Sequence, residues 1–239
     1  IIAISELQKQ ELTEVHNICR KDKVKVIPLG CDLGKFQKDI DQNRIDIREK
    51  YQLKPNEVAI AIIGRFAPIK NHGFFFDVVD NLLSKTKKNV RIFVVGDGEM
   101  KTSIQHRADE LNGKYGPKIE LTSWIKDIAA FNSAMDIICL TSDNEGTPVS
   151  LIEAQASNVA VISTNVGGVR DIMLDGKTGF VVEKGGLKEY TEKLCLLVEN
   201  DEIRTNMSQN GWSHVRDRFH YTRLAKDMEE YYYELLRKV

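Results

Sequence analysis

The chain has little of what marks a membrane-spanning, metal-binding or nucleic-acid-binding protein. No run of apolar residues in its 239 positions is long enough to span a bilayer. Its 34 Lys and Arg are balanced by 35 Asp and Glu, so the basic excess typical of nucleic-acid binders is missing. The four cysteines form no C-x-x-C pair and the five histidines show no metal-ligand spacing. These absences favour a cytoplasmic protein that binds no nucleic acid and no metal.

What the chain does have is an alternation of short apolar runs with longer, helix-like segments. Apolar runs of this length, separated by room for a crossover helix, predict an α/β fold with a doubly wound, Rossmann-like parallel sheet. The commonest strand order in such sheets is 3-2-1-4-5-6, which makes the first and fourth strands neighbours at the point where ligands bind. The predicted strands are 58–63, 89–95, 118–122, 135–140, 159–163 and 179–182.

The turn after the first predicted strand carries two cations. Gly64 and Arg65 end the strand, and Lys70 stands about where the next helix begins. An Arg that forks onto phosphate oxygens and a Lys that acts as a point charge make a diphosphate clamp, and a Gly beside the Arg permits close backbone approach. The alternative is a solvated loop with two unrelated cations. For the nearby His72, a role at the helix start is favoured over chemistry.

Two carboxylates follow the fourth predicted strand, eight positions apart in the sequence. Glu145 is predicted in the turn, and Glu153 about a turn and a half into a helix that Thr147 caps and Pro148 begins. Two acceptors that face one crevice suit the hydroxyls of a sugar or a ribose. The alternative is a pair of solvated carboxylates. The assumed strand order would bring Glu145 and the two cations to one crevice.

Further turns fall at the same edge of the predicted sheet. Gly98 follows the second strand, where it either offers backbone amides to a ligand or makes an ordinary turn. After the third strand, Trp124 either walls a nucleobase pocket or packs in the core, and Ile125 offers its backbone to the base edge. The paired glycines at 167–168 follow the fifth strand and permit close packing or the approach of a ligand.

These motifs, in this order, resemble those of the C-terminal, donor-binding domain of GT-B glycosyltransferases in glycosyltransferase family 4, the glycosyl transferases group 1 proteins. The resemblance runs over nearly the whole chain, and its most specific mark is the E-x7-E pair formed by Glu145 and Glu153. The matching motifs are Ser5-Glu6, residues 26–32 with Phe36, Gly64-Arg65 with Lys70, Gly96-Asp97-Gly98, Glu145-Gly146 with Glu153-Ala154, and Gly167-Gly168.

The resemblance implies a role for each site residue. Arg65 and Lys70 would hold the donor diphosphate, and Glu153 would accept from the ribose hydroxyls. Glu145 would face the donor sugar, together with the backbone amides of Gly146, Thr147 and Val149. One departure concerns the base: Ser123-Trp124 stands where the family usually has a small Gly-containing turn, which leaves the details of base binding open.

By the same resemblance, the protein would be a retaining glycosyltransferase that takes a sugar from a nucleotide-diphosphate donor, with UDP the leading candidate and no metal or other cofactor. The acceptor would be a glycan or a lipid-linked molecule, and the full protein would associate peripherally with the cytoplasmic face of a membrane. Two alternatives stay open, a nucleotide-sugar epimerase of GT-B architecture and a donor-binding module that is inactive alone. A glycosidase is disfavoured, because such a site needs no Arg and Lys arranged for phosphates.

Three regions are expected along the chain. Residues 1–56 would be the end of an N-terminal domain and an interdomain segment, with a helix over 5–18 and a surface loop or short helix over 39–56. Residues 57–220 would form the nucleotide-sugar-binding domain. Residues 221–239 would form a C-terminal helix whose apolar stripe is predicted to face the core, unless it braces a second domain and is left exposed. The acceptor-binding N-terminal domain is expected to be missing from this chain.

Overall fold

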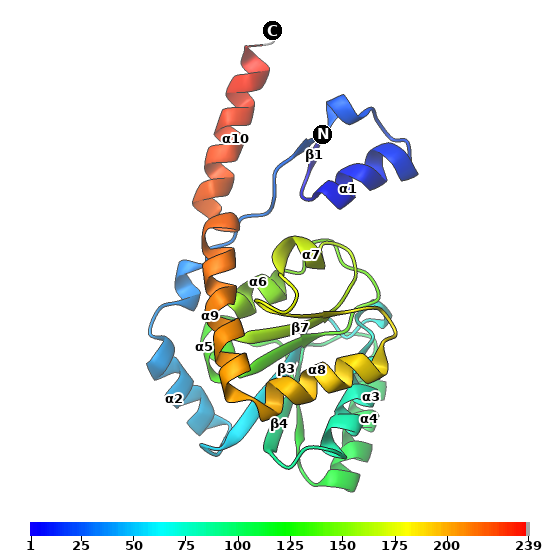
Figure 1. Ribbon diagram of the computed structural model, residues 1–239, viewed down its shortest axis with the longest axis vertical. Coiled ribbons are helices and arrows are strands. Elements are labelled where there is room, and N and C mark those ends of the chain that lie inside the picture. The colour runs from blue at the N-terminus through cyan, green and yellow to red at the C-terminus, as the bar shows by residue number, and fades with distance from the viewer. Residues whose placement is uncertain (238–239) are drawn as a thin grey trace.

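A six-stranded, fully parallel sheet forms the centre of the protein, as the computed structural model of residues 1–237 shows (Figure 1). The strand order is β5-β4-β3-β6-β7-β8, which confirms the predicted order and places the first and fourth predicted strands side by side. The strands are β3 (Glu57–Ile63), β4 (Asn89–Val95), β5 (Ile119–Thr122), β6 (Ile137–Leu140), β7 (Ala160–Thr164) and β8 (Gly179–Val182).

Helices cover both faces of this sheet, which is why its strands are continuous apolar runs. Ile60 and Ile62 of β3 point to the face covered by α3 (His72–Leu83), α4 (Lys101–Tyr115) and α8 (Leu187–Glu199). Ala59 and Ala61 point to the opposite face. That face is covered by α2 (Ile40–Lys50), α5 (Ile128–Ala134), α6 (Val149–Ala156), α7 (Val169–Ile172) and the end of α9 (Asp201–Arg218).

The helix after β6 begins one residue later than predicted. Pro148, rather than Thr147, occupies the cap position, and Val149 is the first helical residue. No side chain caps α6. Its first backbone amides are therefore left for another acceptor.

Beside the sheet domain, whose core already includes Leu33 and Phe36, residues 1–27 form a small unit (Figure 1). Its strands β1 (Ile2–Ala3) and β2 (Lys25–Val26) pair in parallel. The helix predicted over 5–18 is shorter: α1 (Glu6–Gln10) continues as a π-helical segment, Glu11–Val15, and ends before Asn17, whose φ of 50° is left-handed. Short 3-10 turns follow at Lys21–Lys23 and Gly34–Phe36. Of the two structures left open for 39–56, the helix is present as α2.

The last helix, α10 (Tyr221–Leu236), projects away from the sheet domain (Figure 1). None of its residues is buried, so the prediction that its apolar stripe faces the core is wrong. Its beginning packs closely, since a Cβ added at Gly30 would lie 2.6 Å from Leu224 Cβ. Further along, Lys25 of β2 pairs with Glu234 and lies over the ring of Tyr231. Within residues 1–237, no helix has both the length and the apolar character needed to cross a membrane. The division into regions 1–56, 57–220 and 221–239 stays a prediction.

Candidate functional site

The predicted meeting of a cation and a carboxylate at the carboxyl edge of the sheet is present. Lys70 ends the short 3-10 turn Pro68–Lys70 after β3, and Glu145 lies in the loop after β6. Lys70 Nζ lies 2.5 Å from Glu145 Oε1, although the residues are 75 positions apart. Their side chains are 24% and 11% exposed. The strand order therefore produces the juxtaposition that the sequence predicted.

Arg65 stands at the same edge but is held differently. Its guanidinium is 69% exposed and pairs with Glu99, with 3.2 Å between Arg65 Nη2 and Glu99 Oε2. Among residues 1–237, Glu99 is the one carboxylate in an ion pair with it. An exposed pair of this kind contributes little to stability, so Arg65 can exchange Glu99 for a phosphate at small cost.

Of the three glycines predicted to bind the donor, Gly64 and Gly98 have amides that already donate within the protein. The N–H of Gly64 donates to the carbonyl of Val95 at 3.0 Å, and that of Gly98 donates to Asp97 Oδ1 at 2.8 Å. Gly98 has a φ of +152°, and a Cβ there would lie 2.6 Å from the carbonyl oxygen of Phe66. Gly98 thus lets the turns after β3 and β4 pack together. A role for Gly98 in donor binding stays a prediction.

Free amides lie instead at the start of α6. Within residues 1–237, no protein group accepts from the N–H of Gly146, Thr147, Val149 or Ser150. Val149 and Ser150 begin α6, and Gly146 and Thr147 lie in the loop just before it, so the donors are grouped at a helix N-terminus, where the helix dipole also favours negative charge. The loop that carries these amides starts at Glu145. The unpaired donors therefore belong to, or lie next to, the residues predicted to face the donor sugar.

The glycines after β7 hold this loop in position. Gly168 donates from its N–H to the carbonyl of Gly146 at 2.8 Å. Gly167 has a φ of +51°, and a Cβ there would lie 1.6 Å from the carbonyl oxygen of Glu145. Of the two roles left open for this pair, the close packing of two loops is the one present.

Glu153 lies further along α6 and is half buried. Burial raises the pKa of its carboxyl group, and the positive charge of Lys35 partly opposes this shift. Burial also raises the pKa of Cys31, and the charge of Glu153 adds to that shift. Glu153 is therefore a carboxylate with few water contacts, flanked by two residues that the sequence did not single out.

The two residues predicted to bind the base differ in exposure. Trp124 is 57% exposed, which excludes the core packing left open for it. Ile125 is half buried and packs against the core cluster under α5 and α6. A role for either residue in base binding stays a prediction.

His72 is buried at the first turn of α3, the helix start that the sequence favoured for it. It meets Phe66 edge to face, with 5.2 Å between ring centroids. Neither of its ring nitrogens has a hydrogen-bond partner in the described part of the chain. Burial, helped by the charge of Lys70, lowers the pKa of His72 to about 4. His72 is therefore neutral at pH 7 and adds no charge to the site.

Two cavities lie at the carboxyl edge of the sheet. One, of about 140 Å³, has Glu145, Gly146 and Gly168 on one wall and the N-terminal helix residues Gln8 and Glu11 on the other. The second, of about 410 Å³, lies between α3 and α4 and includes residues 71–73 in its lining. The first is the space that the sugar-facing residues border.

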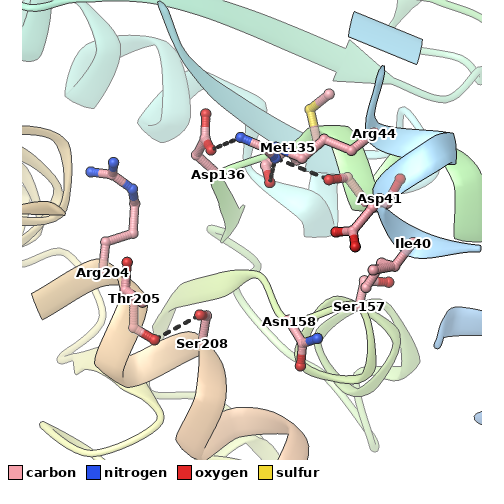
Figure 2. Close-up of a pocket in the computed structure, with 11 residues that line it drawn as sticks. Ile40, Asp41, Arg44, Met135, Asp136, Ser157, Asn158, Arg204, Thr205 and Ser208 are labelled. Atoms are coloured by element: carbon pink, nitrogen blue, oxygen red, sulfur yellow. Dashed lines mark hydrogen bonds and ion pairs between the residues drawn. The ribbon is translucent and has the colours of Figure 1, made fainter. Parts of the chain in front are cut away.

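A further cavity, of about 360 Å³, lies at the opposite edge of the sheet. Figure 2 shows Arg44 and Asp136 joined across it, with Arg204 and Ser208 reaching in from α9. Arg44 Nη2 lies 2.6 Å from Asp136 Oδ1. No residue predicted for the site lies there. Across residues 1–237, no three His, Cys, Asp or Glu side chains gather in the way that a metal site requires.

Comparison with known proteins agrees with this geometry. The family model "Glycosyl transferases group 1" matches residues 43–214, and the chain belongs to that family. The chain is 31% identical to the Staphylococcus aureus capsular polysaccharide biosynthesis glycosyltransferase CapM, over 100% of this chain and 62% of that protein. It is 28% identical to the Escherichia coli UDP-Gal:alpha-D-GlcNAc-diphosphoundecaprenol alpha-1,3-galactosyltransferase, over 93% of this chain and 59% of that protein. The chain thus spans about three fifths of the length of these relatives.

Solved structures share the fold. A glycosyltransferase from Rickettsia africae superposes with a TM-score of 0.86 at 24% identity, over 100% of this chain and 64% of that one. Anabaena Alr3699/HepE in complex with UDP-glucose superposes with a TM-score of 0.85 at 18% identity, over 98% and 63% of the two chains. The expected α/β fold with a doubly wound parallel sheet, as in GT-B glycosyltransferases, is confirmed.

Proposed function

We propose that this chain is the donor-binding half of a retaining glycosyltransferase of family 4, which transfers a sugar from a nucleoside-diphosphate donor. The observation that carries the proposal is the Lys70–Glu145 contact beside the free amides of α6, at the switch point of the sheet. UDP is the favoured nucleotide, because the E. coli relative is named for a UDP-galactose donor and the Anabaena structure contains UDP-glucose.

The proposed chemistry follows from where charge develops. As the bond between sugar and diphosphate breaks, negative charge grows on the departing phosphate and the sugar becomes positive. Arg65, Lys70 and the amides at the start of α6 are preorganised donors for that negative charge, and such donors stabilise the transition state more than the ground state. In this proposal no metal is needed, and the departing phosphate takes the proton of the acceptor on the same face of the sugar, with retention of configuration.

The acceptor in this proposal is a glycan or a lipid-linked molecule, bound by a facing N-terminal domain. Two relatives support that class, since one is named for capsular polysaccharide biosynthesis and the other for a diphosphoundecaprenol-linked acceptor. A lipid-linked acceptor would bring the full protein to the cytoplasmic face of a membrane as a peripheral protein.

Calorimetric titration with UDP, GDP and UDP-glucose tests the donor site. Lys70→Ala and Arg65→Ala should each weaken UDP binding by about tenfold to a hundredfold, since each removes a charged hydrogen bond to phosphate worth about 1.5–3 kcal/mol. Arg44→Ala, at the opposite edge of the sheet, is the matched control. Unchanged affinity in both site variants would contradict the proposal, and epimerised donor without any acceptor would favour the epimerase instead.

A further inference from the structure

Two adjacent hydroxyl residues, Thr141 and Ser142, follow β6 directly and are 1% and 0% exposed. Neither belonged to the predicted site. Thr141 Oγ1 lies 3.1 Å from the carbonyl oxygen of Lys70 and 3.2 Å from that of Asn71, so its hydroxyl donates to this short backbone segment. Thr141 therefore anchors the backbone from which the Lys70 side chain extends.

Ser142 is fixed from two directions. Its carbonyl oxygen accepts from Thr164 Oγ1 on β7 at 2.7 Å. Its own hydroxyl donates to Glu145 Oε1 at 2.6 Å, the length of a charge-assisted O–H···O⁻ bond. The neighbouring strand thus orients Ser142, and Ser142 orients the carboxylate of Glu145.

The two oxygens of Glu145 are used unequally. Oε1 accepts from both Lys70 Nζ and Ser142 Oγ. Oε2 accepts from no group in residues 1–237. Because the side chain is only 11% exposed, a Glu145 that lost all its donors would carry a poorly solvated charge, which is costly.

Binding of a diphosphate would redistribute these contacts. A phosphate that approaches Lys70 competes with Glu145 for the same ammonium group. Once that ammonium turns to phosphate, Ser142 is the donor that remains on Oε1. Without Ser142, Oε1 would have no donor once Lys70 pairs with the diphosphate, and Glu145 would swing out of its position.

We propose that Ser142 is a positioning residue of the donor site. It holds Glu145 through Oε1, so that Oε2 stays free to accept from a hydroxyl of the donor sugar while Lys70 pairs with the diphosphate. This inference rests on the proposed function. Ser142 itself touches no substrate and acts only through Glu145.

A set of four proteins tests the inference: wild type, Ser142→Ala, Glu145→Ala and the double variant, each titrated calorimetrically with UDP and with UDP-glucose. Ser142→Ala should weaken UDP-glucose binding about tenfold and UDP binding by at most about twofold, because a hydrogen bond to a charged acceptor is lost only where the sugar meets Glu145. In the Glu145→Ala background, Ser142→Ala should change neither affinity. Ser133→Ala is the matched control, since Ser133 is a buried serine whose hydroxyl donates at 2.7 Å near the opposite edge of the sheet.

Equal losses for UDP and UDP-glucose, or a loss that persists without Glu145, would show that Ser142 is merely structural and would overturn the inference. A wild-type protein that binds neither ligand would refute the proposed function instead. In that case the unfolding free energies of the same four proteins decide whether Ser142 acts on Glu145, since interacting residues give non-additive changes. If the two substitutions changed the unfolding free energy additively, Ser142 and Glu145 would not interact, and the inference would also be overturned.

Discussion

The two edges of the sheet both carry arginines and carboxylates, but they use their hydrogen-bonding groups differently. At the amino edge, Arg48 donates to the carbonyls of Ala134, Lys54 and Glu57 and to Asp136. At the carboxyl edge, Arg65 holds one exposed carboxylate, and the amides at the start of α6 donate to nothing in residues 1–237. Polar groups fully paired within the protein stabilise the fold, whereas groups left with unused donors are available to a ligand.

Charge alone would not separate these two edges. The cavity of Figure 2 is lined by Arg44 and Arg204, two cations of the kind that bind phosphate. Arg44 donates to the carbonyls of Ser133 and Met135 as well as to Asp136. Arg204 donates to the carbonyl of Leu197 and to Asp201. The guanidinium groups at this edge thus donate to backbone carbonyls at the ends of helices and strands and stabilise them.

Among the substitutions compared, Arg48→Met at the amino edge should have the largest effect on the free energy of unfolding. Arg48 and Asp136 are each 13% exposed, and removing one partner of a buried ion pair is strongly destabilising. Arg48→Met should lower the free energy of unfolding by about 3 kcal/mol. The loss is no larger because Asp136 keeps its ion pair with Arg44. UDP affinity should not change. Denaturant unfolding and calorimetry measure the two quantities.

Arg65→Met should have the opposite pair of effects. UDP affinity should be lost, whereas the free energy of unfolding should stay unchanged. If the two arginine variants lost stability and binding in parallel, the distinction between the two edges would be wrong.

The pH dependence of stability should be set in part by His72 at the carboxyl edge. Its folded pKa of about 4 is below the ordinary 6.5, so the unfolded chain binds a proton that the folded chain excludes. Stability should therefore fall as pH decreases from about 6.5 to 4, by up to about 3 kcal/mol from this residue. In His72→Phe that part of the slope should vanish. Unfolding curves of both proteins between pH 7.5 and 4.5 measure it, and identical slopes would show that His72 titrates normally.

Glu153→Gln should have the smallest effect, confined to binding. Replacing its carboxylate with an amide should weaken UDP about tenfold, through the loss of a charged acceptor for a ribose hydroxyl. The loss for 2′-deoxy-UDP should be clearly smaller. Calorimetry with both nucleotides gives the ratio, and equal losses would remove the ribose assignment.

The sequence predicted the sheet and the central contact of the site for a physical reason. Apolar runs buried on both faces, with helical crossovers between them, allow few topologies, and the commonest places Lys70 beside Glu145. The close approach of Gly98 to Phe66 could not be predicted, because it depends on how the turns after β3 and β4 pack together. Ser142 was missed for a similar reason: a small hydroxyl in an apolar setting gives no sign of its acceptor. The apolar stripe of α10 predicted an amphipathic helix, but the sequence did not indicate which surface packs against the apolar face.

The most direct test of the account is to map the amide chemical shifts of the isotope-labelled protein during titration with UDP. The largest shifts should occur at Gly146, Thr147, Val149 and Ser150, the free donors at and just before the start of α6, and none should occur at Arg44 or Asp136. Shifts centred on the Arg44–Asp136 cavity, or a saturating titration that leaves the α6 amides unchanged, would contradict it.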